Sequence, residues 1–249
     1  MNLIYLTCFI KPEYGIMANL FIQSLIHYYN TNRYELYIFV DNQTSTIVST
    51  FLDECKTIQF KYKLIHVQVN TIFIAATYRV NIFSHIDINN FDKILYVDTD
   101  ILISGSLDIL FNIDIDNKIH VVKEVQTKPY HCLYHNNVEY EQHKEDCFSS
   151  GIILFDKTLK NYFEQVKHYM IYGINNNFLI GSCYDQPFFN YIAHKMNCFN
   201  NNSINQYTTC NPIGIIQPQI IHHFAGVVGH HESKLKKMNE FIIHNHLFL

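Results

Sequence analysis

Short apolar runs of strand type alternate along this chain with segments whose apolar side chains recur at helical spacing. The runs Leu3–Phe9 and Leu36–Val40 enclose one such segment, in which Tyr14, Met17 and Leu25 belong to the helical pattern. Further strand-like runs lie near Lys63–Val69, at Lys93–Val97 and at Gly151–Phe155. A repeated strand, helix, strand order predicts an α/β fold with a Rossmann-like, mostly parallel sheet that carries helices on both faces.

Length and charge narrow the class of protein. The 249 residues fit one α/β domain spanning 1–249, and a formal net charge of −4 without a stripe of Lys and Arg excludes a nucleic-acid binder. The apolar start is too short for a membrane span and lacks the basic leader of a signal peptide. Seven scattered cysteines without a C-x-x-C pair are typical of reduced thiols. We therefore expect a cytoplasmic protein with no membrane span.

Two carboxylates end the apolar run at 93–97. Asp98 and Asp100 are spaced i and i+2, so both side chains can converge on one ion where the strand enters its turn. Ligands bind at the carboxyl ends of strands in α/β sheets, and hard oxygen ligands suit Mn²⁺ or Mg²⁺ that also bridges phosphates. The alternative is a turn-capping Asp98 beside a merely solvated Asp100. The pair predicts a site for a metal and a diphosphate.

Three other segments complete the pattern. The polar stretch from Thr127 to Asp146 predicts a long loop or a small excursion over the site. The stretch from Asn197 to Asn205 predicts a loop, because Asn-rich composition follows from codon bias as readily as from function. The run Gln219–Phe224, followed by Gly226 and Gly229, predicts a strand that enters a glycine-rich turn.

Six short motifs resemble, in the same order along the chain, those of the retaining glycosyltransferases of family 8, to which glycogenin and the bacterial lipopolysaccharide galactosyltransferases belong. The motifs are Leu6-Thr7 with Tyr14, Tyr78-Arg79, Asp98-Thr99-Asp100, Cys147-Phe148-Ser149-Ser150-Gly151, Tyr184-Asp185-Gln186 and His223-Phe224-Ala225-Gly226. They cover nearly the whole chain. The resemblance implies a single glycosyltransferase domain with the GT-A nucleotide-sugar transferase fold.

The resemblance also implies roles for residues. It places Asp98, Asp100 and His223 on the metal, Mn²⁺ or Mg²⁺, and gives Asp185 and Gln186 to catalysis near the anomeric carbon. It assigns donor binding to Leu6, Thr7, Tyr14, Arg79, Asp98, Thr99, Asp100, Ser149, Ser150, Gly151 and Gly226. The expected activity is therefore metal-dependent, retaining transfer of a hexose from a UDP-sugar.

Several assignments have alternatives that the residues leave open. Tyr14 could stack on the uracil or belong to the helix core, and Arg79 could pair with a phosphate or a carboxylate. His222 is a rival to His223, although strand alternation sends the two side chains to opposite faces. Asp185 precedes Pro187 and a helix, so it could be no more than an N-terminal cap.

The whole function has alternatives as well. Family members usually carry a Lys a few residues after the His-Phe-x-Gly motif, and Gly229 stands there, with His230, His231 and Lys234 as substitutes. Without a substitute, the chain could be a catalytically silent nucleotide-sugar-binding protein. A nucleotidyltransferase is disfavoured because no glycine-rich, basic phosphate loop follows the first strand.

Substrate identity is only partly indicated. Glucose is favoured over galactose because Asp146-Cys147-Phe148 resembles glycogenin, while the acceptor, a glycan, a protein or a lipid-linked sugar, stays open. Self-glucosylation and a homodimer are conceivable from the resemblance alone.

Overall fold

The computed structural model describes residues 1–28, 33–55, 61–125, 133, 137–178, 183–213, 218–226 and 231–247. A seven-stranded sheet with the order β3-β2-β1-β4-β7-β6-β8 forms its centre. The strands of this sheet are β1 (Asn2–Cys8), β2 (Tyr34–Val40), β3 (Tyr62–His66), β4 (Ile94–Val97), β6 (Ile119–Lys123), β7 (Phe148–Phe155) and β8 (Phe199–Asn200). A second, three-stranded sheet has the order β5-β10-β9 and consists of β5 (Ile101–Ile103), β10 (Ile221–His223) and β9 (Thr208–Cys210).

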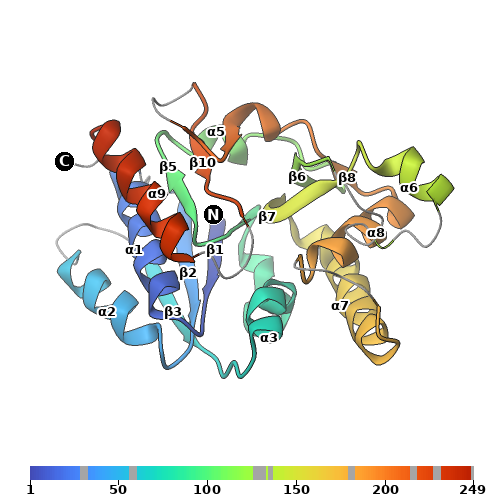
Figure 1. Cartoon of the computed structure of the whole chain (residues 1–249), viewed down its shortest axis with the longest axis horizontal. Helices are drawn as coiled ribbons and strands as arrows, with labels where there is room; N and C mark the ends of the chain where they lie inside the picture. Colours follow the sequence, from blue (N-terminus) through green and yellow to red (C-terminus); the bar gives the residue numbers. More distant parts are fainter. Residues whose placement is uncertain are drawn as a thin grey trace.

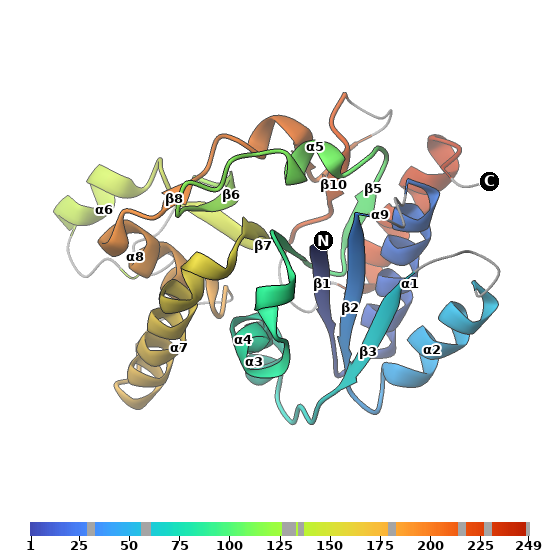
Figure 2. The same ribbon diagram turned by 180° about the vertical axis from the view of Figure 1, so that it is seen from behind.

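Helices lie around the sheet, and Figures 1 and 2 show α1, α2 and α9 gathered beside β1, β2 and β3, with α7 and α8 at the β7 end. The α-helices are α1 (Pro12–His27), α2 (Ser45–Glu54), α3 (Ile72–Thr77), α4 (Ile82–His85), α5 (Asp108–Phe111), α6 (Asn137–His143), α7 (Lys160–Asn175), α8 (Gln186–Met196) and α9 (His231–His244). Short 3-10 helices are η1 (Tyr78–Asn81), η2 (Ile88–Asn90), η4 (Lys157–Leu159) and η5 (Asn205–Tyr207).

The sheet is mixed but mostly parallel, as the alternating pattern predicts. β1 pairs in parallel with β2 and β4, and β2 pairs in parallel with β3. Every residue of β4 and of β7 is buried, which explains the uninterrupted apolar runs in β4 and in the second half of β7. β1 also lacks exposed positions, so its pattern is a continuous run rather than an alternation.

β7 differs from the expectation in two ways. It begins at Phe148, three residues before the predicted Gly151, and it runs antiparallel to both β4 and β6. The reversed direction brings the start of β7 to the edge where β4 ends, and the amide of Asp98 donates to the carbonyl of Gly151 over 2.8 Å. Because β7 is antiparallel, its first residues lie at the same edge of the sheet as the last residues of the parallel strands β1 and β4.

Two predicted loops contain regular structure. The stretch 197–205 includes β8, which pairs in parallel with β6 and extends the sheet by one short strand. The excursion at 127–146 includes α6, while residues 126–132 and 134–136 lie outside the described residues. In the parts of the chain that the structure describes, every helix falls short of the length and apolar character needed to cross a membrane.

α9 is held against α1 by a small apolar cluster of its own. Met17 on α1, Leu102 on β5 and Phe224 after β10 pack with Met238 and Phe241 on α9, and all five are buried. This packing brings the first turn of α9 to the carboxyl-end edge of the main sheet, close to the turn after β4 (Figure 1).

Candidate active site

Three potential metal ligands meet where the two sheets join. Asp98 and Asp100 lie in the turn between β4 and β5, and His223 ends β10, where it pairs with Ile101 of β5. One ligand atom from each of the three residues falls within 4.8 Å of the other two. Within the described ranges this is the one group of three or more such ligands. The turn after β4 and the β5–β10 pairing together create the group.

The surroundings of the three side chains suit a divalent cation. His223 Nε2 lies 3.4 Å from Asp100 Oδ1, and this Oδ1 is buried without a hydrogen-bond partner. A Cβ on Gly151 would come within 2.6 Å of the His223 ring and 2.9 Å of Asp98 Oδ2, so the glycine keeps the space beside the ligands open. Two carboxylates and one imidazole form an O, O, N donor set that fits Mn²⁺ or Mg²⁺.

The charges of the group are strongly coupled. Burial alone would lower the pKa of His223, but the Asp100 carboxylate beside it raises that pKa to about 10. Burial would raise the pKa of Asp100, whereas Lys234 and His223 hold it well below its ordinary value. Without a metal, the site therefore contains an ionised carboxylate between two cationic side chains.

His222 is separated from this group by strand alternation. Its ring packs against Phe241, with 4.8 Å between the ring centroids, and its Nε2 lies 2.7 Å from Ser104 Oγ. Burial lowers the pKa of His222 to about 4, so it stays neutral. The two neighbouring histidine side chains thus lie in different environments, and of the two only His223 lies beside the carboxylates.

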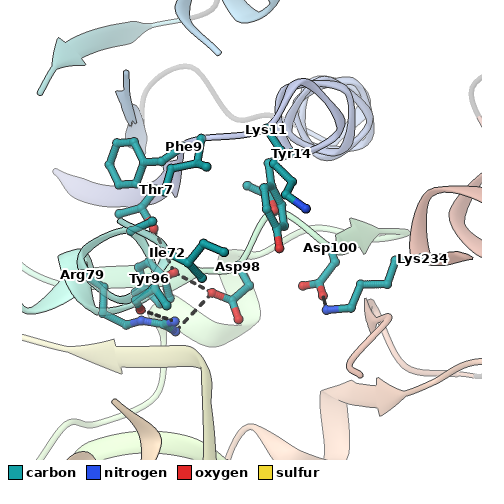
Figure 3. A pocket seen from close by; sticks show the side chains of 14 residues that line it. Thr7, Phe9, Lys11, Tyr14, Ile72, Arg79, Tyr96, Asp98, Asp100 and Lys234 are labelled. Atoms are coloured by element: carbon teal, nitrogen blue, oxygen red, sulfur yellow. Dashed lines mark hydrogen bonds and ion pairs between the residues drawn. The ribbon is translucent and has the colours of Figure 1, made fainter. Parts of the chain in front are cut away.

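Lys234 reaches the group from the first turn of α9. Its Nζ lies 2.5 Å from Asp100 Oδ2, and its side chain is only 15% exposed. Figure 3 shows the lysine pointing at Asp100 from the side opposite Asp98. Gly229 and His230 lie outside the described residues, as does the side chain of His231. Lys234 is one of the three substitutes named from the sequence, and the structure brings its ammonium to Asp100.

Arg79 connects the metal group to Asp185. Its Nη1 lies 3.1 Å from Asp98 Oδ1 and its Nε lies 2.9 Å from Asp185 Oδ2. Nη1 also donates to the carbonyl of Ser150 over 2.5 Å, and the guanidinium lies over the ring of Tyr96 at 4.5 Å from its centroid. Both carboxylates raise the pKa of Arg79 against the opposing effect of burial. The carboxylate pairing that the sequence offered for Arg79 is therefore present, with two carboxylates.

Asp185 occupies the position before α8 but makes no side-chain capping bond. It is 1% exposed, and its Oδ1 accepts from Ser150 Oγ over 3.3 Å. Burial raises the pKa of Asp185 to about 6, Arg79 opposes that rise and Asp98 adds to it. A buried carboxylate that contacts a cation instead of the helix amides fits a role in the site better than one as a cap.

Gln186 is fixed at both ends of its amide. Its Oε1 accepts from the amide of Ser150 over 3.3 Å, and its Nε2 donates to Glu124 Oε2 over 3.1 Å. Glu124 directly follows β6, and together with Gln186 it lines a cavity. It was not predicted from the sequence. Its position after a strand was the signal that could have identified it, as with Asp98.

A single cleft joins these groups. One cavity contains the expected Thr7, Tyr14, Arg79 and Thr99, and Figure 3 shows Tyr14 pointing from α1 toward the two aspartates. A second cavity contains the expected Ser149, Ser150, Gly151, Asp185, Gln186, His223 and Gly226. Both cavities are also lined by Ala76, Arg79, Asp98, Asp100 and Lys234. The metal group therefore lies between an aromatic half and a polar half of one cleft.

Leu6 does not belong to this lining. Its side chain is 0% exposed in the hydrophobic core, so that side chain does not face the cleft. Successive side chains of a strand point to opposite faces, and the next residue, Thr7, faces the cavity, with its Oγ1 3.3 Å from the hydroxyl of Tyr96. Three further residues, Phe9, Ile10 and Ile72, supply apolar surface at the Tyr14 end and were not predicted from the sequence.

A family model and several solved structures match this chain. The model of glycosyl transferase family 8 matches residues 6–244. A search of curated proteins finds no match. Similar solved structures include apo WbbM, a bifunctional glycosyltransferase, with 13% identity and a TM-score of 0.65 over 96% of this chain. The chain spans about half of WbbM, 50% of its length.

Two other similar structures are matched over most of their length. Galactosyltransferase LgtC in complex with donor and acceptor sugar analogs has 14% identity and a TM-score of 0.64, with 96% of each chain covered. Mouse xyloside xylosyltransferase 1 in its apo form has 14% identity and a TM-score of 0.62, with 89% of this chain and 96% of that one covered. At these identities the structural likeness shows the fold, which is GT-A.

Proposed function

Because the chain belongs to glycosyl transferase family 8 and is therefore a nucleotide-sugar glycosyltransferase, we propose that it transfers a hexose from a UDP-sugar, with retention at the anomeric carbon. In this proposal Asp98, Asp100 and His223 hold Mn²⁺ or Mg²⁺ under the donor diphosphate. The supporting observation is the Asp98, Asp100 and His223 group in the middle of a cleft with one aromatic and one polar end.

The charges in the cleft support metal dependence. Asp98 and Asp100 face its middle, and Arg79, His223 and Lys234 already balance their charge, so a diphosphate would need a further cation there, such as a divalent metal. Arg79 cannot supply that charge, since its guanidinium already binds Asp98 and Asp185. When bound, the metal would neutralise the charge that builds on the departing diphosphate.

The chain's own side chains divide the remaining work. Tyr14 would face the base at the aromatic end. The Lys234 ammonium would move from Asp100 to the diphosphate. Asp185 and the amide of Gln186 border the polar end, where they would support positive charge on the sugar. Ser150 orients both, because its hydroxyl and its amide bind Asp185 and Gln186 respectively.

The donor sugar follows less directly from these contacts. We favour glucose over galactose from the local resemblance at Asp146-Cys147-Phe148. Cys147 and Phe148 are both fully buried, however, and neither is among the residues that line the two cavities. In this proposal, lining residues such as Glu124, Ser149 and Gln186 discriminate between the sugars.

An active enzyme is favoured over a silent nucleotide-sugar-binding protein by the position of Lys234. The silent alternative arose because Gly229 stands where a diphosphate-binding lysine is usual. The Lys234 ammonium, on the first turn of α9, lies beside the metal-group carboxylate of Asp100. The site thus has a lysine available for the diphosphate without one at position 229.

Donor hydrolysis tests the proposal. We would incubate purified protein with Mn²⁺ and a panel of UDP-, GDP- and CDP-sugars and measure release of the nucleoside diphosphate. We expect metal-dependent UDP release from one sugar, reduced by roughly 10² or more in Asp98→Asn. The matched control is Asp114→Asn, an exposed aspartate away from the cleft.

Each outcome is informative. UDP release that survives in Asp98→Asn would contradict the metal assignment, and release from a GDP- or CDP-sugar would contradict the assignment of the base. Metal-dependent UDP binding by calorimetry without any turnover would support the silent alternative.

A further inference from the structure

The backbone at Ile10 is strained. Its φ is 73°, in the left-handed region, and it is the only β-branched residue among the non-glycine positive-φ residues of the described chain. Left-handed backbone is unfavourable for a β-branched side chain, and such strain persists only where the surroundings hold it in place. Ile10 connects β1 to α1, so a specific contact is needed to fix this connection.

Asp41 supplies that contact. It directly follows β2, and its side chain is buried, with Oδ2 accepting from the amide of Ile10 over 2.7 Å. Its Oδ1 accepts from the amides of Gln43 and Thr44 over 3.1 Å each. The Thr44 hydroxyl lies 2.6 Å from the carbonyl oxygen of Cys8. The two adjacent strand ends are therefore joined through one carboxylate.

The strained connection forms a wall of the cleft. Phe9, Ile10 and Lys11 all line the cavity at its aromatic end, and α1, which carries Tyr14, begins at Pro12 immediately after them. Figure 3 shows Phe9, Lys11 and Tyr14 along the same side of the cavity. Asp41 is not among the lining residues. It therefore reaches a ligand through the backbone that it holds rather than by direct contact.

We propose that Asp41 is a positioning residue for the nucleoside of the donor, acting by holding Ile10 in its left-handed conformation. The inference rests on the proposed function, since it assigns the aromatic end of the cleft to the nucleoside. The metal ligands come from the β4–β5 turn and from β10, and neither element contains Asp41. Loss of the Asp41 contact should therefore weaken nucleoside binding and leave metal and diphosphate binding intact.

Asp41→Asn removes this contact with little change in shape. An amide has one oxygen, and the two backbone amides that bind Oδ1 favour placing the oxygen there, which turns the NH₂ group toward the amide of Ile10. The matched control is Asp156→Asn, because Asp156 also binds the amide two residues later, over 2.9 Å, but follows β7 at the far end of that strand.

The experiment measures calorimetric affinity of the full chain for Mn²⁺, for pyrophosphate with Mn²⁺ and for UDP with Mn²⁺. For Asp41→Asn we expect UDP affinity to fall about tenfold, the equivalent of one charge-assisted hydrogen bond. Affinity for Mn²⁺ and for pyrophosphate should change by less than about twofold, because their ligands do not depend on this wall. Asp156→Asn should leave all three affinities unchanged.

A second background separates positioning from a general loss of stability. Glycine adopts positive φ without strain. In Ile10→Gly the backbone at position 10 therefore depends less on the hydrogen bond to Asp41 to keep its left-handed conformation. Asp41→Asn should therefore weaken UDP binding by less than about threefold in that background. A merely structural role would lower the melting temperature equally in both backgrounds and would weaken pyrophosphate and UDP together.

Three results would overturn the proposal. They are normal UDP affinity in a folded Asp41→Asn protein, an equal loss of UDP affinity with and without the Ile10→Gly substitution, and an equal loss for pyrophosphate and UDP. Failure of the unsubstituted chain to bind UDP with Mn²⁺ would instead refute the proposed function, and with it the assignment of the nucleoside to this wall.

Discussion

Replacing Lys234 by methionine should change metal binding and nucleotide binding in opposite directions. Without nucleotide, the Lys234 ammonium on Asp100 Oδ2 already neutralises that carboxylate, so it opposes the binding of a metal to the other oxygen, Oδ1. With nucleotide, the same ammonium is a source of positive charge for a diphosphate. Methionine keeps the apolar stem of lysine but removes the charge, so it tests the charge alone.

The size of both effects follows from the contact. The Nζ to Oδ2 distance is 2.5 Å, and the two side chains are 15% and 7% exposed, so water screens the pair only weakly. A hydrogen bond between charged partners contributes about 1.5–3 kcal/mol, which corresponds to roughly 10-fold to 100-fold in an equilibrium constant. We expect Lys234→Met to bind Mn²⁺ alone at least about tenfold more tightly and to bind UDP at saturating Mn²⁺ at least about tenfold more weakly.

Two titrations measure this. Free Mn²⁺ can be followed by electron paramagnetic resonance, and UDP affinity by calorimetry at saturating metal. The matched control is Lys236→Met on the same helix, whose side chain is 77% exposed and should leave both affinities unchanged. Unchanged or weaker Mn²⁺ binding in a folded Lys234→Met protein would refute the competition, and unchanged UDP affinity would refute the role at the diphosphate.

Other substitutions test the remaining contacts of the site. Gly151→Ala should weaken Mn²⁺ binding by about tenfold or more in the same titration, because its Cβ would lie 2.6 Å from the His223 ring. The pKa of Asp185 is raised from 3.8 to about 6, so its stabilising effect is complete below pH 3.8 and is lost as the pH rises through about 6. Relative to Asp185→Asn, the unsubstituted protein should lose about 3 kcal/mol of unfolding free energy in denaturant titrations between roughly pH 4 and pH 7. Arg79→Lys should lower the free energy of unfolding by about 3 kcal/mol, because an ammonium cannot span Asp98 and Asp185 as the guanidinium does.

Each of these has its own control. Gly226→Ala should be tolerated, since its Cβ would lie 3.6 Å from Lys234 Cε, an ordinary contact. A pH dependence that persists unchanged in Asp185→Asn would assign it to another group. For Arg79, substitution of the half-exposed Arg33 by lysine should cost little, and equal losses at both positions would argue against the clamp.

The chain's strands and its carboxylates were predictable for the same physical reason. A buried strand must be apolar, so an aspartate at its end marks the residue where the chain leaves the core. This placed Asp98 and Asp100 at the sheet edge, and strand alternation separated His223 from His222. Both inferences need only the period of a strand and the position of its end, which a sequence displays directly.

Contacts between distant elements were not predictable in this way. Antiparallel and parallel central strands are equally apolar, so nothing in Phe148–Phe155 reveals the direction of β7. Lys234 was only one of three candidate substitutes, because its position depends on how the apolar face of α9 packs against α1. Asp41 had no signal as a site residue, since its effect depends on the backbone conformation of Ile10.

Two cations share the carboxylates of this site, and their contacts indicate different duties. Arg79 is buried and bound to Asp98, Asp185 and two carbonyl oxygens, so releasing it would leave several buried groups unpaired. The Lys234 ammonium binds Asp100 over 2.5 Å, and Lys234 lines the cleft. Of the two, the lysine can change partners at the smaller cost. A diphosphate arriving with its metal would therefore find Arg79 fixed in place and Lys234 able to turn, so the cleft can gain positive charge for its ligand without dismantling the frame that holds Asp98 and Asp185.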